Sequence, residues 1–60
     1  MGKEIYTGDL VLSLSGRDKG EYFLVTDRKD NRVYLVNGKS RKVNNPKIKN
    51  VKHVQSVLSG

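Results

Sequence analysis

The sequence predicts an all-β domain, a small barrel of five short antiparallel strands. Its apolar residues fall in runs that are too short for helices and that are separated by glycine, asparagine and aspartate. The chain has 60 residues, and a chain of this length buries only about 60% of the surface that its unfolded form exposes. We therefore expect one domain over residues 1–60, with a thin core at about residues 8–58 and no deep cleft.

Three strands are predicted in the first part of the chain. Leu10–Leu14 has the sequence LVLSL, whose alternation places its three leucines on one side. Tyr22–Thr26 and Arg32–Val36 combine β-branched and aromatic residues. The segment between these two runs, DRKDN, contains the aspartate and asparagine that are typical of a tight connection.

A hairpin is predicted after the third strand. Asn37 and Gly38 readily take the positive φ angles that a two-residue turn requires. Lys39–Val43 would then pair back as a short fourth strand. The alternation of that strand places Lys39 and Arg41 on one face.

The tail fits either a strand or a helix. The apolar residues of segment 46–58 have nearly helical spacing, and Pro46 suits the first position of a helix. Repeated valines and polar residues lower the helix propensity, and four strands alone would leave an exposed sheet edge. We therefore favour a last strand at about Val51–Val57, with Pro46–Lys49 as the connection leading to it.

Five strands in so short a chain indicate a barrel of the SH3-like kind, in which SGRDKGE forms the first long turn. Gly16 and Gly20 bracket this turn, and each is expected at a positive φ or in a bulge. Their bare backbone also allows a phosphate or a ribose to approach within reach of Arg17 and Lys19. Asp18 is expected to accept hydrogen bonds from turn amides or to orient Arg17.

The charge is distributed unequally along the chain. Residues 1–30 hold five Lys or Arg and six Asp or Glu, which gives −1, whereas residues 31–60 hold seven Lys or Arg and no acid, which gives +7. Cations without counter-charges repel one another unless an anionic partner neutralises them, and nucleic acid is the commonest such partner. The alternative is a basic face that only keeps the protein soluble.

The residue content argues against several other classes of protein. Cysteine is absent, which excludes disulfides and thiolate sites and favours a reducing cytoplasm. No run approaches the ~20 apolar residues of a membrane span and no signal peptide is recognisable, so a cytoplasmic protein without membrane contact is expected.

Catalytic and metal-binding patterns are also missing from the sequence. His53 is the only histidine, and it lacks both a partner ligand for a metal and a neighbouring nucleophile. The serines have no triad context, and GRDKGE lacks the ending of a nucleotide-binding phosphate loop. We expect no enzymatic activity, no cofactor and no metal.

The chain resembles a KOW domain in two segments. The first is GDLVLSLSGRDKGEYFLVTDRKDNRVYLVNG, where an alternating apolar segment precedes a Gly-Lys/Arg-Asp-x-Gly turn and a second apolar strand, with Gly20 at the motif's glycine position. The second, SRKVNNPKIKNVKHVQ, is similar to the continuation in bacterial KOW-domain RNA-binding proteins that are related to a eukaryotic and archaeal large-subunit ribosomal protein family. There a basic hairpin leads into a Pro-Lys-x-Lys-Asn-x-x-His stretch, which here is Pro46, Lys47, Lys49, Asn50 and His53. The two segments cover about residues 8–55.

This resemblance implies an SH3-like barrel that binds structured RNA such as ribosomal RNA. Ribosomal members usually carry extensions that thread into ribosomal RNA, whereas this sequence ends almost where the expected barrel does. We therefore expect a ribosome-associated accessory rather than a permanent ribosomal component. The contacts would lie in the first turn and in the basic second half. The residues expected to contact RNA are Ser15, Gly16, Arg17, Lys19, Gly20, Lys39, Arg41, Lys42, Lys47, Lys49, Lys52 and His53.

Other partners stay open. SH3-like barrels also bind proteins, so a module that binds an acidic partner or a transcription or translation factor is the alternative function. Ribosomal or transcription proteins are further candidate partners, and in either case the protein is expected to be a monomer. DNA is a lesser option, because counterion release alone does not distinguish it from RNA. Recognition by shape and backbone is expected, since the chain has few aromatic residues to stack on bases: Tyr6, Tyr22, Phe23 and Tyr34, of which Phe23 belongs to the core.

Overall fold

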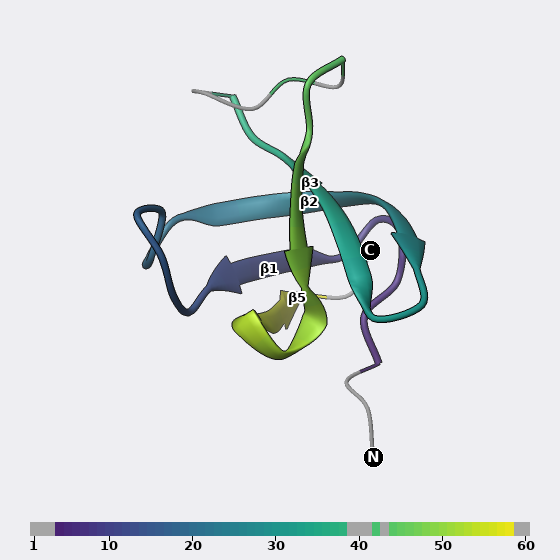
Figure 1. The fold of residues 1–60 in the computed structure, drawn as a ribbon, viewed down its shortest axis with the longest axis horizontal. Coiled ribbons are helices and arrows are strands. Elements are labelled where there is room, and N and C mark those ends of the chain that lie inside the picture. Colours follow the sequence, from purple (N-terminus) through teal and green to yellow (C-terminus); the bar gives the residue numbers. More distant parts are fainter. Residues whose placement is uncertain (1–3, 39–41, 43, 59–60) are drawn as a thin grey trace.

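Five antiparallel strands form one sheet in the computed structural model of the protein, which describes residues 4–38, 42 and 44–58 (Figure 1). The all-β prediction is therefore confirmed. The elements in chain order are β1 (Leu10–Ser13), β2 (Tyr22–Lys29), β3 (Arg32–Val36), β4 (Lys47–Asn50), the 3-10 turn η1 (Val51–His53) and β5 (Val54–Leu58). No helix in the described ranges is both long and apolar enough to cross a membrane.

The two edge strands are joined by only three residues, which determines the curvature of the sheet. β4 and β5 lie at opposite ends of the strand order β4-β3-β2-β1-β5. In a flat sheet they would be about 19 Å apart, whereas three residues of 3-10 helix rise only about 6 Å. The sheet therefore curls until its edges approach, which produces a small barrel of the SH3-like kind.

The inner face of the sheet holds a small apolar core. Inward positions alternate with outward ones on β2, where Phe23 and Val25 are buried while Tyr22 and Leu24 are exposed. Val51 of η1 completes the core together with residues of β1, β3 and β5. The buried apolar cluster consists of Ile5, Val11, Phe23, Val25, Val33, Leu35, Val51 and Val54.

β1 turns its leucines away from this core. The predicted alternation is present, but the fully buried positions are Val11 and Ser13, whereas Leu10 and Leu12 are half-buried on the outer face. Leu10 pairs there with Leu24 of β2. The last inward-facing residue of β1 is therefore Ser13, whose hydroxyl group belongs to the polar network described below.

The predicted second strand is longer in the structure. β2 extends to Lys29, with a register shift between Val25 and Asp27. The connection to β3 is thereby reduced to Asp30 and Asn31, and Asp30 has a positive φ of 53°, a conformation that aspartate and asparagine tolerate better than most residues. This tight turn places Lys29 directly opposite Arg32.

The predicted fourth strand and the connection after it were placed wrongly. β3 pairs with Lys47–Asn50, most of which was expected to be a connection, and Tyr34 lies opposite Ile48. Gly38 does not have the positive φ that the predicted hairpin required. Within Lys39–Val43 only Lys42 is described, and it is not in a strand; the other four residues lie outside the described residues. Pro46, which cannot donate to a sheet ladder, directly precedes β4.

The tail forms a strand rather than a helix, as favoured, but this strand begins at Val54. Val51–His53 forms η1 instead, because the Asn50 side chain caps the turn by accepting a 3.0 Å hydrogen bond from Lys52 N. Val51 N also donates to Asn31 O at 2.8 Å. The nearly helical spacing of the apolar residues thus corresponds to one 3-10 turn between two strands.

Gly20 and Gly38 provide a matched pair of substitutions. An added Cβ would meet no atom within 4 Å at either position, but of the two only Gly20 has a left-handed φ, +89°. Because β-branched residues avoid this conformation, Gly20→Val is expected to lower the free energy of unfolding by about 2 kcal/mol, and Gly38→Val by less than about 0.5 kcal/mol. Urea unfolding followed by circular dichroism measures both. If both variants lost the same free energy of unfolding, the positive φ of Gly20 would not be what restricts substitution at that position.

Candidate nucleic-acid interface

A buried carboxylate holds the first turn, residues 14–21, against β4. Asp18 Oδ1 accepts a 2.8 Å hydrogen bond from Ser13 Oγ and a 2.7 Å hydrogen bond from Lys49 Nζ. Asp18 Oδ2 lies 3.2 Å from Lys47 Nζ, an ion pair without the alignment of a hydrogen bond. One carboxylate therefore joins the end of β1, the turn and two residues of β4.

The Lys49 ammonium group donates all of its hydrogen bonds to acceptors within the protein. Its side chain is only 9% exposed, and Nζ donates to Ser13 Oγ at 3.0 Å, to Ser15 O at 2.7 Å and to Asp18 Oδ1 at 2.7 Å. An ammonium has three N–H donors, so these three acceptors satisfy it completely. Lys49 was expected to contact RNA, but its position makes it an internal cation that supports the turn.

The environment of Asp18 keeps it ionised. Burial by itself raises the pKa of a carboxyl, but the hydrogen bonds from Lys49 and Ser13, and then the contact with Lys47, outweigh this effect. Together they hold the pKa of Asp18 well below its ordinary value of 3.8. Asp18 therefore keeps its negative charge at neutral pH.

The rim of the first turn carries two exposed cations. Turn hydrogen bonds join Lys19 N to Gly16 O at 3.2 Å and Gly20 N to Ser13 O at 2.9 Å, and both glycines have the positive φ that the sequence predicted, +86° and +89°. Within the described part of the chain, the side chains of Arg17 and Lys19 make no hydrogen bond or ion pair. Both are exposed and can bind an external anion.

A groove of about 450 Å³ lies beside this rim. Gly20, Glu21, Tyr22, Asn37 and Gly38 line it. The Tyr22 side chain is 55% exposed, and Asn37 Nδ2 donates to Glu21 Oε1 at 3.4 Å across the groove. The two glycines leave the backbone uncovered, since no atom lies within 4 Å of the place of a Cβ at either.

A further cation reaches the groove from the loop after β3. Exposed Lys42 donates from Nζ to Gly38 O at 3.0 Å, so its ammonium lies at the groove wall. An ammonium has three N–H donors, and among the described residues the other two have no partner. An aromatic ring, uncovered backbone and cations thus occur together at this end of the barrel. This combination suits a single-stranded nucleic acid, whose bases stack while its phosphates bind cations.

The other residues expected to contact RNA lie at various distances from this groove. His53 is half-buried, and its carbonyl oxygen accepts a 2.8 Å hydrogen bond from Leu14 N, which places η1 against the start of the first turn. Lys52 is exposed on η1. Ser15 contributes its carbonyl oxygen to Lys49. Lys39 and Arg41 lie outside the described residues.

Tyr22 and Asn37 belong to this site but were not among the predicted contacts. For Tyr22 the sequence held a usable signal: if Phe23 is a core residue, the alternation of a strand turns Tyr22 outward at the end next to the turn. Asn37 offered no such signal, because its place in the groove depends on how β3 leaves the sheet.

No metal cluster accompanies the site: the described ranges contain no group of three or more His, Cys, Asp or Glu that could hold a metal ion. No protein-family model matches the chain, and no curated protein sequence matches it. The interpretation of the site therefore rests on its own geometry and charge.

Asp18→Asn tests whether the buried carboxylate supports the barrel. The substitution keeps the shape of the side chain but leaves the buried Lys49 ammonium without a counter-charge, so we expect the free energy of unfolding at pH 7 to fall by about 3 kcal/mol. Lys47→Gln is the control, because the Lys47 side chain is 29% exposed and its loss should cost about 1 kcal/mol or less. Urea unfolding of both variants measures the difference.

Acid provides a second check on the same variant. Because the pKa of Asp18 is depressed in the fold, its contribution to stability is complete above the ordinary carboxyl pKa of 3.8 and is lost as the pH falls below it. The stability gap between the parent and Asp18→Asn should therefore narrow between pH 6 and pH 2. A stability gap that stays constant over this range would contradict a role for ionised Asp18 in stabilising the fold.

Proposed function

We propose that this protein is a non-catalytic RNA-binding protein, associated with the ribosome, that binds structured RNA through the first turn and the groove beside it. The observation that carries the proposal is the pair of exposed cations, Arg17 and Lys19, on a hydrogen-bonded turn next to the exposed ring of Tyr22. The buried Asp18 network supports that turn from inside.

The electrostatic part of the mechanism is counterion release. The chain carries +6 at pH 7, and lysines and arginines that meet phosphates displace condensed counterions. Lys47 and Lys49 are bound to Asp18. We therefore assign the phosphate contacts to four other cations: Arg17, Lys19, Lys42 and, on η1, Lys52. An arginine can bind a phosphate through two parallel hydrogen bonds, whereas a lysine acts as a point charge.

The groove adds a contact with one base. Unpaired bases in RNA loops and bulges stack on aromatic side chains, and Tyr22 presents more than half of its surface. Gly20 and Gly38 allow the sugar-phosphate backbone to come close, because neither carries a side chain. We therefore propose a loop or bulge of a folded RNA as the ligand, held mainly by its backbone.

The resemblance to KOW-domain proteins is what suggests ribosomal RNA among the folded RNAs. The segment with the motif's glycine, Gly20, is the segment that carries the two exposed cations. His53, which belongs to the second segment of the resemblance, lies next to the same turn through its backbone. In this proposal the two lysines of that segment that take part in the resemblance, Lys47 and Lys49, support the turn rather than contact RNA.

One observation favours the alternative of a protein-interaction module. The outer face of the sheet carries leucines in register across three strands: exposed Leu58 of β5 pairs with half-buried Leu10 of β1, which pairs with exposed Leu24 of β2. Exposed apolar patches often mark protein contacts. Binding that is insensitive to salt and does not require RNA would favour this function.

The salt dependence of RNA binding tests the proposed function. With about four phosphate contacts, the log-log slope of affinity against salt should be about −3 for a ribosomal RNA hairpin. Replacing Arg17 and Lys19 by glutamine should flatten the slope by about 1.4–1.8 and weaken binding at least tenfold at 0.1 M salt. Fluorescence anisotropy at several salt concentrations measures both quantities.

Lys47→Gln serves as the control for that experiment, because it removes a cation that is bound internally and should leave the slope nearly unchanged. Duplex DNA of the same length is the control ligand. An unchanged slope in the double variant, or equal affinity for duplex DNA, would overturn the proposal.

Tyr22→Leu tests the stacking contact. Base stacking on an aromatic side chain contributes about 1–3 kcal/mol, so this variant should bind the RNA hairpin about 5- to 150-fold more weakly. Tyr6→Leu is the matched control, since Tyr6 is 60% exposed and does not line the groove. Equal losses of affinity in the two variants would show that Tyr22 is not a stacking platform.

A further inference from the structure

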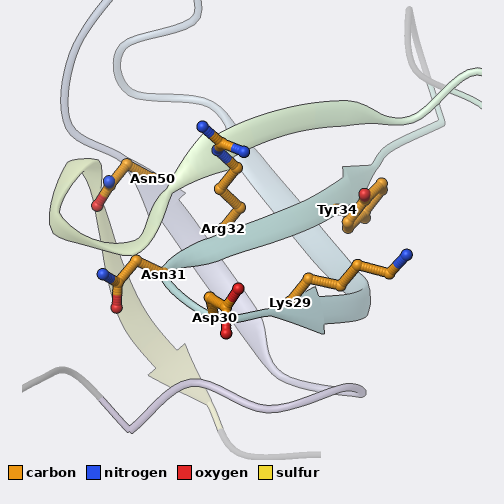
Figure 2. A pocket seen from close by; sticks show the side chains of 6 residues that line it. All are labelled: Lys29, Asp30, Asn31, Arg32, Tyr34 and Asn50. Carbon is orange, nitrogen blue, oxygen red and sulfur yellow. The ribbon is translucent and has the colours of Figure 1, made fainter.

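A second pocket lies at the opposite end of the β2–β3 pair (Figure 2). It has a volume of about 420 Å³ and is lined by Lys29, Asp30, Asn31, Arg32, Tyr34 and Asn50. Tyr22 begins β2 and Lys29 ends it, so about 23 Å of strand separates this pocket from the groove. Its volume falls within the range of roughly 300–1,000 Å³ that is usual for small-molecule sites.

The pocket contains an unbalanced pair of cations. Lys29 and Arg32 are direct cross-strand neighbours, and both are exposed. Like charges in this arrangement destabilise a sheet. Within the described ranges neither side chain makes a hydrogen bond or an ion pair, although the carboxylate of Asp30 lines the same pocket. Figure 2 shows their charged ends extending in different directions, and both side chains are exposed, so an external anion could draw the two ends together and relieve the repulsion.

The remaining groups of the pocket suit the other parts of a nucleotide. Tyr34 follows Arg32 on the outer face of β3 and is half-buried, which fixes its ring as a wall (Figure 2). Aromatic walls stack on bases, and a carboxylate such as that of Asp30 accepts hydrogen bonds from ribose hydroxyls. The Asn50 side chain accepts from Lys52 N through Oδ1, so its amide nitrogen has donors left for a base edge.

The hairpin that forms the pocket is held in place at three points. Arg28 donates to Asp30 O at 2.9 Å and, through its guanidinium, to Ile5 O at 2.8 Å. On the other side of the turn, Asn31 O accepts the 2.8 Å hydrogen bond from Val51 N. The N-terminal segment and η1 are therefore both tied to the hairpin by hydrogen bonds, which limit the movement of its backbone.

We propose that this pocket binds one ribonucleotide. Its phosphate lies between Lys29 and Arg32, its ribose 2′-hydroxyl donates to Asp30, and its base packs on Tyr34. That this nucleotide is part of an RNA strand bound to the first turn rests on the proposed function. That the pocket binds a nucleotide at all is independent of the proposed function.

Nuclear magnetic resonance titration of the ¹⁵N-labelled protein tests the proposal. The probes are adenosine 5′-monophosphate, its 2′-deoxy form, adenosine and inorganic phosphate. The ribonucleotide is expected to shift the amide signals of residues 30–34 and Asn50, to bind at least tenfold more tightly than adenosine and inorganic phosphate, and to bind at least threefold more tightly than the deoxynucleotide. Absence of shifts at these amides, or equal binding of inorganic phosphate, would overturn it.

Two variants separate binding from folding. Lys29→Glu places opposite charges across the hairpin, so it should raise the melting temperature while weakening ribonucleotide binding at least tenfold. Asp30→Asn keeps a residue that tolerates a positive φ, and it should abolish the preference for ribose over deoxyribose. If Lys29→Glu bound the ribonucleotide as tightly as the parent, Lys29 would not hold the phosphate and the proposal would fail.

The nucleotide titration and the RNA-binding measurements together distinguish a failure of this pocket proposal from a failure of the proposed function. If the ribonucleotide leaves the hairpin signals unchanged while RNA binding still depends on Arg17 and Lys19, only the second pocket is disproved. If the ribonucleotide binds at the hairpin while RNA binding is insensitive to Arg17 and Lys19, only the first-turn interface is disproved.

Discussion

The ion pair between Asp18 and Lys49 is the contact on which the rest of the structure depends. It joins a loop near the start of the chain to an edge strand near its end, 31 positions apart, at 2.7 Å and in a largely buried place. Such a pair tolerates the loss of neither partner, because the remaining charge would be buried alone. It also stabilises the first turn, which contains two glycines with positive φ. The backbone that carries Arg17 and Lys19 is therefore held in place.

This ion pair also changes how the charge of the chain should be counted. By sequence, seven cations of residues 31–60 have no acid near them, yet the fold brings Asp18 of the other half to Lys47 and Lys49. Asp18 thus offsets part of the repulsion among the seven cations of residues 31–60. The cations that face solvent come instead from both halves, since Arg17 and Lys19 belong to residues 1–30, so neither half of the sequence corresponds to the binding surface.

The sequence predicted the fold wherever burial follows hydrophobicity. β2, β3 and the positive φ of Gly16 and Gly20 could be deduced from alternation and turn chemistry. The pattern misleads where a polar network takes core positions: in β4, Lys49 pairs with buried Val33 while Ile48 is 54% exposed. Lysines are almost never buried unless they are paired, and the partner, Asp18, is too distant in sequence for periodicity to reveal. The same network explains why Ser13, and not a leucine, faces inward on β1.

The ladder of β2 and β3 sets the distance between the two proposed binding sites. The groove at Tyr22 and the pocket at Lys29 lie at opposite ends of β2, which pairs with β3 from Leu24 to Lys29. A strand of RNA that occupied one site would meet the other at a high effective concentration only if its own fold spanned about 23 Å. Selection would then come from the shape of the RNA rather than from its base sequence. The groove has one exposed tyrosine and the pocket has one half-buried tyrosine, so the protein has few side chains with which to read a base sequence. Recognition by the spacing of two sites requires no further base contacts.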